Sequence, residues 1–434
     1  MKKKLFSVVV AFLCLNCIDE VDIGISSVES NQGILIVEGT LTNEFKTHKI
    51  VLSRMDTLVD LGIDPVIIPF LPIRDINRDL VPYERNATVS VTDEFGAKFD
   101  FEETSPGIYQ SRNQFAAEMG NSYQLKIIRA NGLSYSSKQM KLEGVSTIEN
   151  IYAEKTISDS GANGIGIFID NRIQEGDVEN LRFIYHETYK IIAPDWSPQE
   201  FLLTDYDPCA LPVPTYNLEI IERQEEERIC YATKPSDVIL QTQISNQEDN
   251  DIKKLKVRFL SKDNFIISHR YSIEVTQMVT GSESYGFYNQ LNNFSQTGNI
   301  FSQVQPGFLE GNLFADNGST GTVIGFFDLV TASKKRLFFN FSDFYPNEPL
   351  PPYIINCSET TSPESHISYC SSGPSIPQPC PQSVIERVNL DVISYVRPNE
   401  ETGQCDGPHI YVANICGDCT LLGSNTIPDF WIEE

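Results

Sequence analysis

Residues that commonly carry catalysis or bind metals are scarce in this 434-residue chain. Histidine occurs five times, and no two histidines stand three or four positions apart, so a helical pair of metal ligands is absent. No Gly-x-Ser-x-Gly sequence marks a nucleophile elbow. We therefore expect no catalytic residues, no metal and no cofactor. A hydrolase of unrecognised type stays open, because acidic residues are abundant enough to supply a carboxylate pair.

Positive charge is also in short supply. The chain has 33 lysines and arginines against 59 aspartates and glutamates, which gives a formal net charge of −26. Nucleic-acid binding requires a clustered basic face, and an acidic protein repels polyanions. We expect no nucleic acid among the partners.

The apolar run near the N-terminus, residues 5–15, is shorter than the roughly 20 residues that a membrane-spanning helix needs. Three lysines precede it and Cys17 follows it, which is the arrangement of a secretory signal. A cysteine at the cleavage point is typical of a bacterial lipoprotein. We predict a signal peptide over residues 1–16 and lipidation of Cys17, which would anchor the chain to the outer membrane.

Two alternatives to this signal peptide and lipidation site stay open. The signal could be an ordinary cleaved one with incidental cysteines, or Cys14 could carry the lipid, although the residue before it, Leu13, is bulkier than Asn16 before Cys17. Residues 17–31 read as an acidic, flexible tether. Within it, three acids resemble the tag that sends Bacteroidota lipoproteins to the cell exterior, and the alternative is a solvated tether on the periplasmic face. These acids are Asp19, Glu20 and Asp22.

Ten cysteines less Cys14 and Cys17 leave eight, an even count that in an exported chain predicts disulfides. They are Cys209, Cys230, Cys357, Cys370, Cys380, Cys405, Cys416 and Cys419. Cys209 and Cys230 stand far from the other six, and we predict that they pair. Cys416 and Cys419 form a Cys-x-x-Cys sequence, which could be a redox pair or half a zinc site. We favour structural disulfides from these two cysteines to other partners.

Short strand patterns separated by turns dominate the first third of the chain. They cover residues 34–37, 49–53, 87–92, 98–101, 107–109, 122–128 and 133–141. Gly96 and the pair Asn131-Gly132 mark hairpin turns. This spacing predicts an Ig-like or prealbumin-like β-sandwich domain over residues 32–144.

A larger β-rich domain is predicted over residues 145–355. Its strand patterns cover residues 165–170, 181–192, 238–244, 255–260, 271–280, 322–329 and 335–341. One helix begins at Ser282 and ends near Gly298, with a row of apolar side chains at Tyr285, Tyr288, Leu291 and Phe294. The cysteine-rich tail, residues 356–434, is expected to pack on this domain through Phe430 and Trp431.

Two further segments are candidates for contacts. Residues 65–72 are apolar and rich in proline, and they form either a partner-contact surface or a segment packed across its own sandwich. The predicted contact residues are Val66, Ile67, Ile68, Phe70 and Leu71. Trp196 lies in a proline-rich loop, where it touches a ligand or packs on that loop.

Several short sequences, in this order, resemble a Bacteroidota outer-membrane lipoprotein family catalogued only as domain of unknown function number 4249. They are Leu35-Ile36-Val37-Glu38-Gly39, Tyr271-Ser272-Ile273, residues 282–288, residues 306–312, Val323-Ile324-Gly325-Phe326-Phe327, Cys416-Gly417-Asp418-Cys419 and Pro428-Asp429-Phe430-Trp431. The resemblance implies no catalytic residues. It implies a place beside TonB-dependent outer-membrane receptors.

The sequence therefore predicts a non-catalytic lipoprotein on the cell surface that acts as an accessory or ligand-capture partner of a TonB-dependent β-barrel receptor. The ligand is not identified by any motif. The alternative is a surface adhesin or glycan-binding module.

Metabolic labelling with an alkyne fatty acid should mark the wild type and a Cys14→Ala variant, because the predicted acyl carrier is the thiol of Cys17. The Cys17→Ala variant should stay unmarked. Labelling is read by gel fluorescence after coupling to a dye. A Cys17→Ala chain labelled as strongly as the wild type would contradict the anchor.

Overall fold

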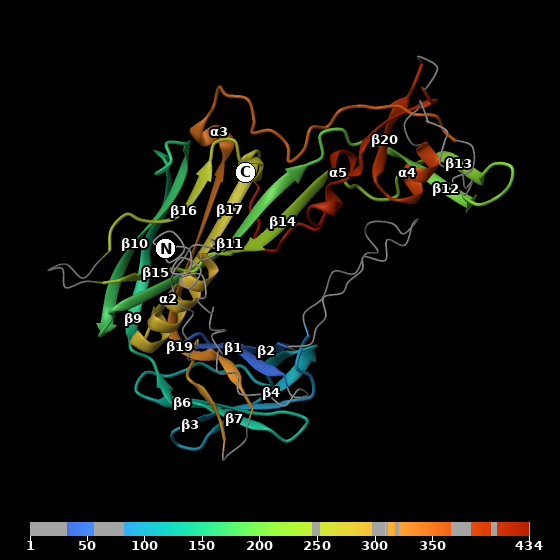
Figure 1. Cartoon of the computed structure of the whole chain (residues 1–434). Coiled ribbons are helices and arrows are strands. Elements are labelled where there is room, and N and C mark those ends of the chain that lie inside the picture. The colour runs from blue at the N-terminus through green and yellow to red at the C-terminus, as the bar shows by residue number, and fades with distance from the viewer. Residues whose placement is uncertain are drawn as a thin grey trace, which may run out of the picture.

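The computed structural model gives a mainly β protein, as the sequence predicts (Figure 1). It describes residues 33–55, 82–244, 252–296, 309, 311–316, 321–365, 383–400 and 406–433. Three groups of strands, here called the first unit, the second unit and the C-terminal unit, follow one another along the molecule. No helix among the described residues has the length and apolar character to cross a bilayer.

The first unit is a β-sandwich, in agreement with the prediction. Its first eight strands are β1 (Ile34–Thr42), β2 (Lys49–Met55), β3 (Thr88–Asp93), β4 (Lys98–Ser105), β5 (Ile108–Ser111), β6 (Ser122–Ile128), β7 (Ser134–Ser137) and β8 (Met140–Lys141). Alternate residues of β1 enter the core, where Leu35, Val37 and Leu41 are fully buried, while Glu38 points to solvent. Gly96 and Gly132 adopt positive φ angles of 88° and 87° at the predicted turns.

A long strand, β19 (Val323–Asn340), joins the first unit to the second. Residues 323–330 pair in parallel with β1, and residues 331–340 pair antiparallel with β17 (Arg270–Thr280). The sequence predicted two separate strands here, over residues 322–329 and 335–341, and the structure joins them into one strand. A 14-stranded sheet therefore runs through both units. The first unit also takes in β18 (Leu313–Ala315), so it extends beyond the sequence-based range 32–144.

The second unit is a sandwich of two sheets. One contains β16 (Leu255–Ser261), β10 (Asn163–Gly176) and β9 (Gly144–Ile157), and the other contains β15 (Leu240–Gln243), β14 (Ile229–Pro235), β11 (Asn180–Ile192), β17 and the second half of β19. The core between them includes Ile167, Phe183 and Tyr271, all at most 1% exposed. Thr331 Oγ1 donates to the carbonyl oxygen of Gly144 at 2.6 Å and fastens β9 to β19.

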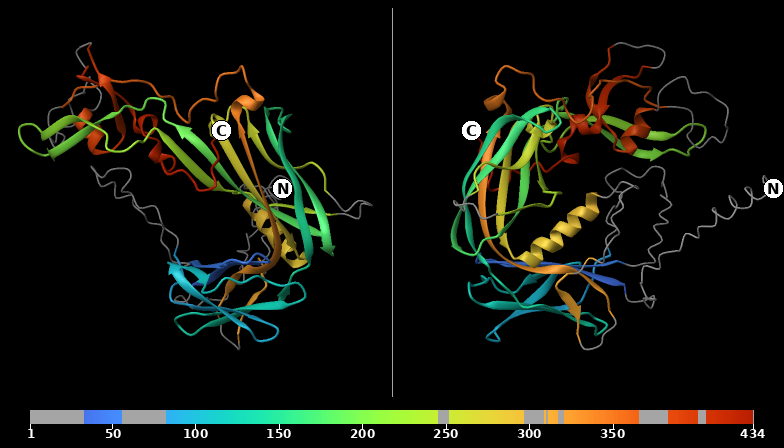
Figure 2. Two further views of the ribbon diagram at one scale, coloured as in Figure 1. Left: turned by 180° about the vertical axis from the view of Figure 1, so that it is seen from behind. Right: turned by 60° about the vertical axis from the view of Figure 1, so that its left-hand side comes forward.

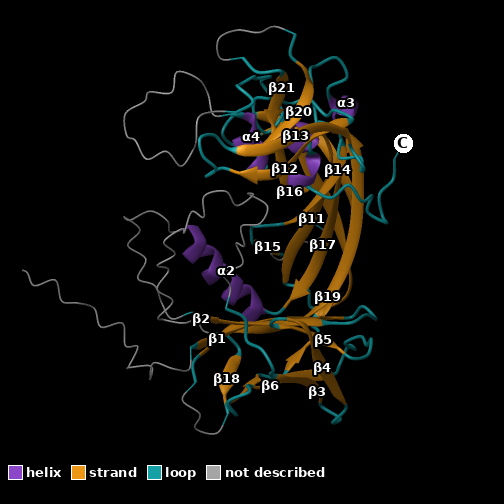
Figure 3. Cartoon of the chain, turned by 90° about the vertical axis from the view of Figure 1, so that its right-hand side faces the viewer, coloured by secondary structure: helices purple, strands orange, loops and turns teal. Residues whose placement is uncertain are grey.

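The predicted helix is α2 (Ser282–Gln296), which lies beside the concave face of β11 and β17 (Figure 3). The face that contacts the protein carries Ser284, Phe287 and Tyr288, at i, i+3 and i+4 spacing. It is therefore rotated from the predicted row of Tyr285, Tyr288, Leu291 and Phe294. Phe287 packs on Phe326 of β19, with 5.3 Å between ring centroids.

The C-terminal unit combines segments that are distant in sequence. The hairpin of β12 (Gln199–Asp207) and β13 (Thr215–Glu222) lies beside α4 (Val384–Asn389), β20 (Ile393–Pro398) and β21 (His409–Ala413) (Figure 2). Its small core contains Val384, Ile393 and Tyr411, with Phe201 and Leu218 packed against it. The short helices α3 (Phe341–Phe344) and α5 (Asn414–Gly417) and the 3₁₀ turns η2 (Phe265–Ile267) and η3 (Cys419–Leu421) complete the described elements.

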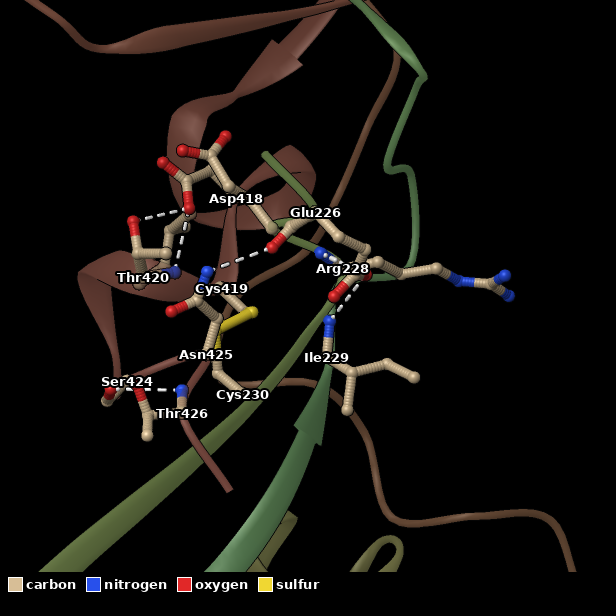
Figure 4. The surroundings of a disulfide bond; sticks show 12 residues. Glu226, Arg228, Ile229, Cys230, Asp418, Cys419, Thr420, Ser424, Asn425 and Thr426 are labelled. Carbon is tan, nitrogen blue, oxygen red and sulfur yellow. Dashed lines mark hydrogen bonds between the residues drawn. A yellow bond between two sulfur atoms is a disulfide. The ribbon is translucent and has the colours of Figure 1, made fainter. Parts of the chain in front are cut away.

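One disulfide joins this tail, residues 356–434, to the second unit, and another lies within the tail. Cys230 of β14 pairs with Cys419 (Figure 4). Cys357 pairs with Cys416. The predicted Cys209–Cys230 pair is therefore wrong, although Cys209 is also disulfide-bonded. The interpretation of the Cys-x-x-Cys sequence as two structural disulfides to other partners is confirmed.

The reason for the wrong pairing is tertiary. Ser424 exchanges two backbone hydrogen bonds with Tyr231 on β14, at 2.8 and 2.9 Å, and this pairing places Cys419 beside Cys230. Trp431 then packs on Tyr231 and Phe338, which confirms the predicted packing of the C-terminus on the second unit.

A substitution at Gly325 tests how tightly β1 and β19 are packed where they pair. Its φ is +134°, and a Cβ there would lie 1.9 Å from the carbonyl oxygen of Val37. We expect Gly325→Ala to lower the free energy of unfolding by about 2–4 kcal/mol, measured by urea unfolding.

Gly286 in α2 is the matched control, because nothing lies within 4 Å of a Cβ built on it. Gly286→Ala should be neutral or stabilising by up to about 1 kcal/mol. Equal unfolding midpoints for the two variants would argue against a tight β1–β19 contact.

Candidate functional site

Many of the residues that the sequence singles out lie outside the described part of the chain. They are Cys17, Asp19, Glu20, Asp22, Val66, Ile67, Ile68, Phe70, Leu71, Cys370, Cys380 and Cys405. Their assigned roles stay predictions. Within the described part, a different set of residues comes together.

A cleft of about 790 Å³ occupies the inner corner between the first and second units. One side is formed by β1, β2 and the loop between them, and the other by β11, β17 and β19. Tyr288 of α2 and residues 236–239, which connect β14 to β15, complete the lining. Figure 3 shows α2 in this corner, between β1 and the concave face of β11 and β17.

Strand alternation decides which residues line the cleft. On β1 the odd-numbered apolar residues enter the sandwich core, so Glu38 and Thr40 face the corner. On β11 Phe183 and Tyr185 belong mainly to the second core, so Arg182, Ile184 and His186 face the corner. The cleft is therefore lined by the outward faces of two sandwiches that share one sheet.

A buried ion pair lies at the inner end of this corner. Arg182 Nη2 is 3.0 Å from Asp328 Oδ2, and the two side chains are 7% and 0% exposed. Ser284 Oγ of α2 donates to the same carboxylate oxygen at 2.7 Å. Tyr288 covers the guanidinium, with 3.8 Å from Arg182 Cζ to the ring centroid. The pair therefore connects β11, β19 and α2.

Burial shifts the pKa values of two groups in this region, Asp328 and His48. Burial raises the pKa of the Asp328 carboxyl, and the positive charge of Arg182 and the hydroxyl of Ser284 offset part of that rise. Burial lowers the pKa of His48, whose Nε2 donates to the carbonyl oxygen of Phe115 at 2.9 Å. The imidazole of His48 is therefore held in its neutral form at neutral pH.

Two further acids of the cleft, Glu44 and Glu274, are paired with cations. Glu44 contacts Lys46 and Lys334, the latter at 2.9 Å, and this second pair joins the first unit to β19. Glu274 pairs with Arg336 at 2.8 Å. Among the described residues, no group of three His, Cys, Asp or Glu side chains is placed to hold a metal ion.

Sequence reasoning missed Arg182 and Asp328. Both stand in strongly apolar strand sequences, Leu-Arg-Phe-Ile and Phe-Phe-Asp-Leu-Val, where a single charge is unusual. Such an isolated charge is the signal that could have marked them. Their proximity could not be read from the sequence, because the two residues lie far apart in the chain, at positions 182 and 328.

The two tryptophans serve packing in this structure. Trp196 is partly buried against the core of the second unit. Trp431 is 8% exposed, and Phe430 packs on Arg336, with 3.6 Å from the guanidinium carbon to the ring centroid.

The fold and cleft define a mainly β protein of two joined sandwiches, and a family model described as Domain of unknown function (DUF4249) matches residues 18–336. The chain belongs to this family. No curated protein matches the chain. The matched range contains every residue that lines the corner cleft, and it ends within β19.

The ion pair yields a stability prediction. Asp328→Ala leaves the Arg182 charge buried and uncompensated, so we expect a loss of about 3–5 kcal/mol in urea unfolding. Adding Arg182→Met removes that charge, and the double variant should lose at least about 1 kcal/mol less than the sum of the single losses.

Asp100→Ala is the matched control, because it breaks an exposed ion pair with Lys98. The side chains of Lys98 and Asp100 are 54% and 42% exposed. It should change the free energy of unfolding by less than about 0.5 kcal/mol. A comparable loss in Asp100→Ala and Asp328→Ala would contradict the role of burial.

Proposed function

We propose that this chain is a non-catalytic lipoprotein of the outer membrane, displayed on the cell surface, that captures a ligand for a TonB-dependent β-barrel receptor. The lipid on Cys17 would hold the acidic β body next to the membrane. Several acyl chains on one cysteine exceed the single-chain limit at which membrane binding becomes reversible.

Three observations support an exported, anchored protein. The N-terminal sequence has a basic start, a short apolar run and Cys17 at the expected cleavage point. Disulfides such as Cys230–Cys419 form and persist in oxidising compartments. The sequence resembles a Bacteroidota lipoprotein family, and the chain belongs to the matching domain family.

The corner cleft is the observation that carries ligand capture. It is large enough for a small molecule, and its lining combines apolar side chains with many polar and charged ones, which could orient a ligand. Its two sides come from two sandwiches joined by β19, which fixes their relative position. A rigid site of this kind loses little conformational entropy on binding.

The described surface gives no specific support to an adhesin. A glycan-binding sheet would gather exposed aromatic side chains on one face. The most exposed phenylalanines among the described residues are Phe45, Phe95 and Phe314, and they lie in the β1–β2 loop, in the β3–β4 turn and on β18.

The test is co-purification of the tagged full chain from gently solubilised cells, followed by mass spectrometry. We expect an outer-membrane β-barrel receptor to be recovered with the wild type. Alanine at Ile67, Ile68 and Phe70 should weaken this recovery if residues 65–72 contact the partner.

Leu211→Ala is the control for that variant, because Leu211 is 82% exposed and lies far along the chain from the predicted contact. It should leave recovery unchanged. Purification of the wild type without any barrel partner would overturn the receptor-accessory proposal.

A further inference from the structure

The corner cleft contains a buried cation whose hydrogen-bonding capacity is only partly used. Arg182 is 5% exposed, and its Nη1 has no hydrogen-bond acceptor, whereas Nη2 contacts Asp328. A guanidinium presents five N–H donors in a planar fork, so one carboxylate does not satisfy it. A buried donor without an acceptor is unfavourable, and a ligand oxygen at Nη1 would remove that cost.

Besides Asp328, apolar and aromatic side chains lie close to Arg182. Tyr288 stacks over the guanidinium at 3.8 Å, and Met278 Sδ lies 3.9 Å from Nη2. Ile184 and Val238 also line the cleft and are 37% and 54% exposed. An apolar body placed on these side chains would be removed from water next to the cation.

Asp328 is the one acid paired with Arg182 in the described residues, and the other acids of the cleft are either paired elsewhere or exposed. Glu44 and Glu274 are engaged by lysine and arginine partners. Glu38 and Asp237 are exposed, and Lys49 is an exposed cation of the same lining. Exposed charges are screened by salt. Asp328 offsets part of the Arg182 charge, so the attraction for an anion depends on the unused donor Nη1.

We propose that the cleft binds an amphipathic carboxylate, with its carboxylate at Nη1 of Arg182 and its apolar body on Ile184, Val238, Met278 and Tyr288. This deepens the proposed ligand-capture function and rests on it. Hydrogen bonds from a guanidinium to a carboxylate are charge-assisted and stronger than neutral ones, so a carboxylate is a better acceptor for Nη1 than an amide. The same chemistry is offered by a fatty acid and by the C-terminus of an apolar peptide.

Isothermal titration of the purified full chain carrying Cys17→Ser tests the proposal with two pairs of probes. Octanoate is compared with octanamide, and N-acetyl-leucyl-leucine with its C-terminal amide. Each pair has the same shape and differs in the carboxylate. We expect the carboxylate of at least one pair to bind about 10- to 100-fold tighter than its amide, as one charge-assisted hydrogen bond predicts.

The pair that shows this preference identifies the source of the ligand. Preference within the octanoate pair indicates a lipid-like acid, and preference within the peptide pair indicates a peptide C-terminus. Arg182→Lys keeps a cation but loses the planar fork, and it should reduce the preference to less than about threefold.

A second variant avoids the buried ion pair, since Arg182→Lys could destabilise the fold. Val238→Asp places a negative charge on the half-exposed apolar lining and should weaken carboxylate binding at least about fivefold. Leu211→Asp, which adds the same charge at an 82% exposed site outside the cleft, should change binding less than twofold.

Three results would overturn the inference. They are equal affinity for acid and amide in both pairs, absence of binding by all four probes, and equal weakening by Val238→Asp and Leu211→Asp. Each of them is compatible with recovery of a barrel receptor in the co-purification experiment. Failure of this inference is therefore distinguishable from failure of the proposed function.

Discussion

The fold depends on β19, an 18-residue strand that belongs to two sandwiches. Successive side chains of β19 point alternately into a core and to the opposite face of the sheet. Phe327 and Leu329 enter the first core, and Leu337 and Phe339 enter or pack against the second. Ala332 and Lys334 line the corner cleft, and Asp328 pairs with Arg182 on the same side of the strand. A shift of β19 by one residue in either sandwich would turn its core-facing side chains outward and its outward-facing side chains into the core. Its pairing with β1 and β17 is therefore fixed, and this pairing fixes the angle between the units.

The same alternation creates the candidate site. The two cores take the apolar residues of each strand, and the polar and half-exposed residues are left on the concave side of the bent sheet. At the bend, Asp328 is fully buried and needs the charge of Arg182 and the hydroxyl of Ser284. Structural stability and the free donor of Arg182 therefore come from one side chain, so a change at Arg182 affects both.

The C-terminal segment depends on longer-range constraints. Its small core of Val384, Ile393 and Tyr411 needs the β12–β13 hairpin, which is inserted between strands of the second unit. The disulfides Cys230–Cys419 and Cys357–Cys416 close separations of 189 and 59 residues. Cross-links over such separations limit the conformations of the unfolded chain, which compensates for a thin core.

The sequence by itself determined the local features of this protein. Period-two apolar patterns located most of the strands of both sandwiches, the Asn131-Gly132 pair located a hairpin, and helix spacing located α2. These features depend on neighbours a few residues away, which a single sequence displays directly. The tertiary structure alone decided that β19 is continuous, that Cys230 pairs with Cys419 and that Arg182 meets Asp328. Each of these depends on packing between segments far apart in the chain, and no local pattern records such packing.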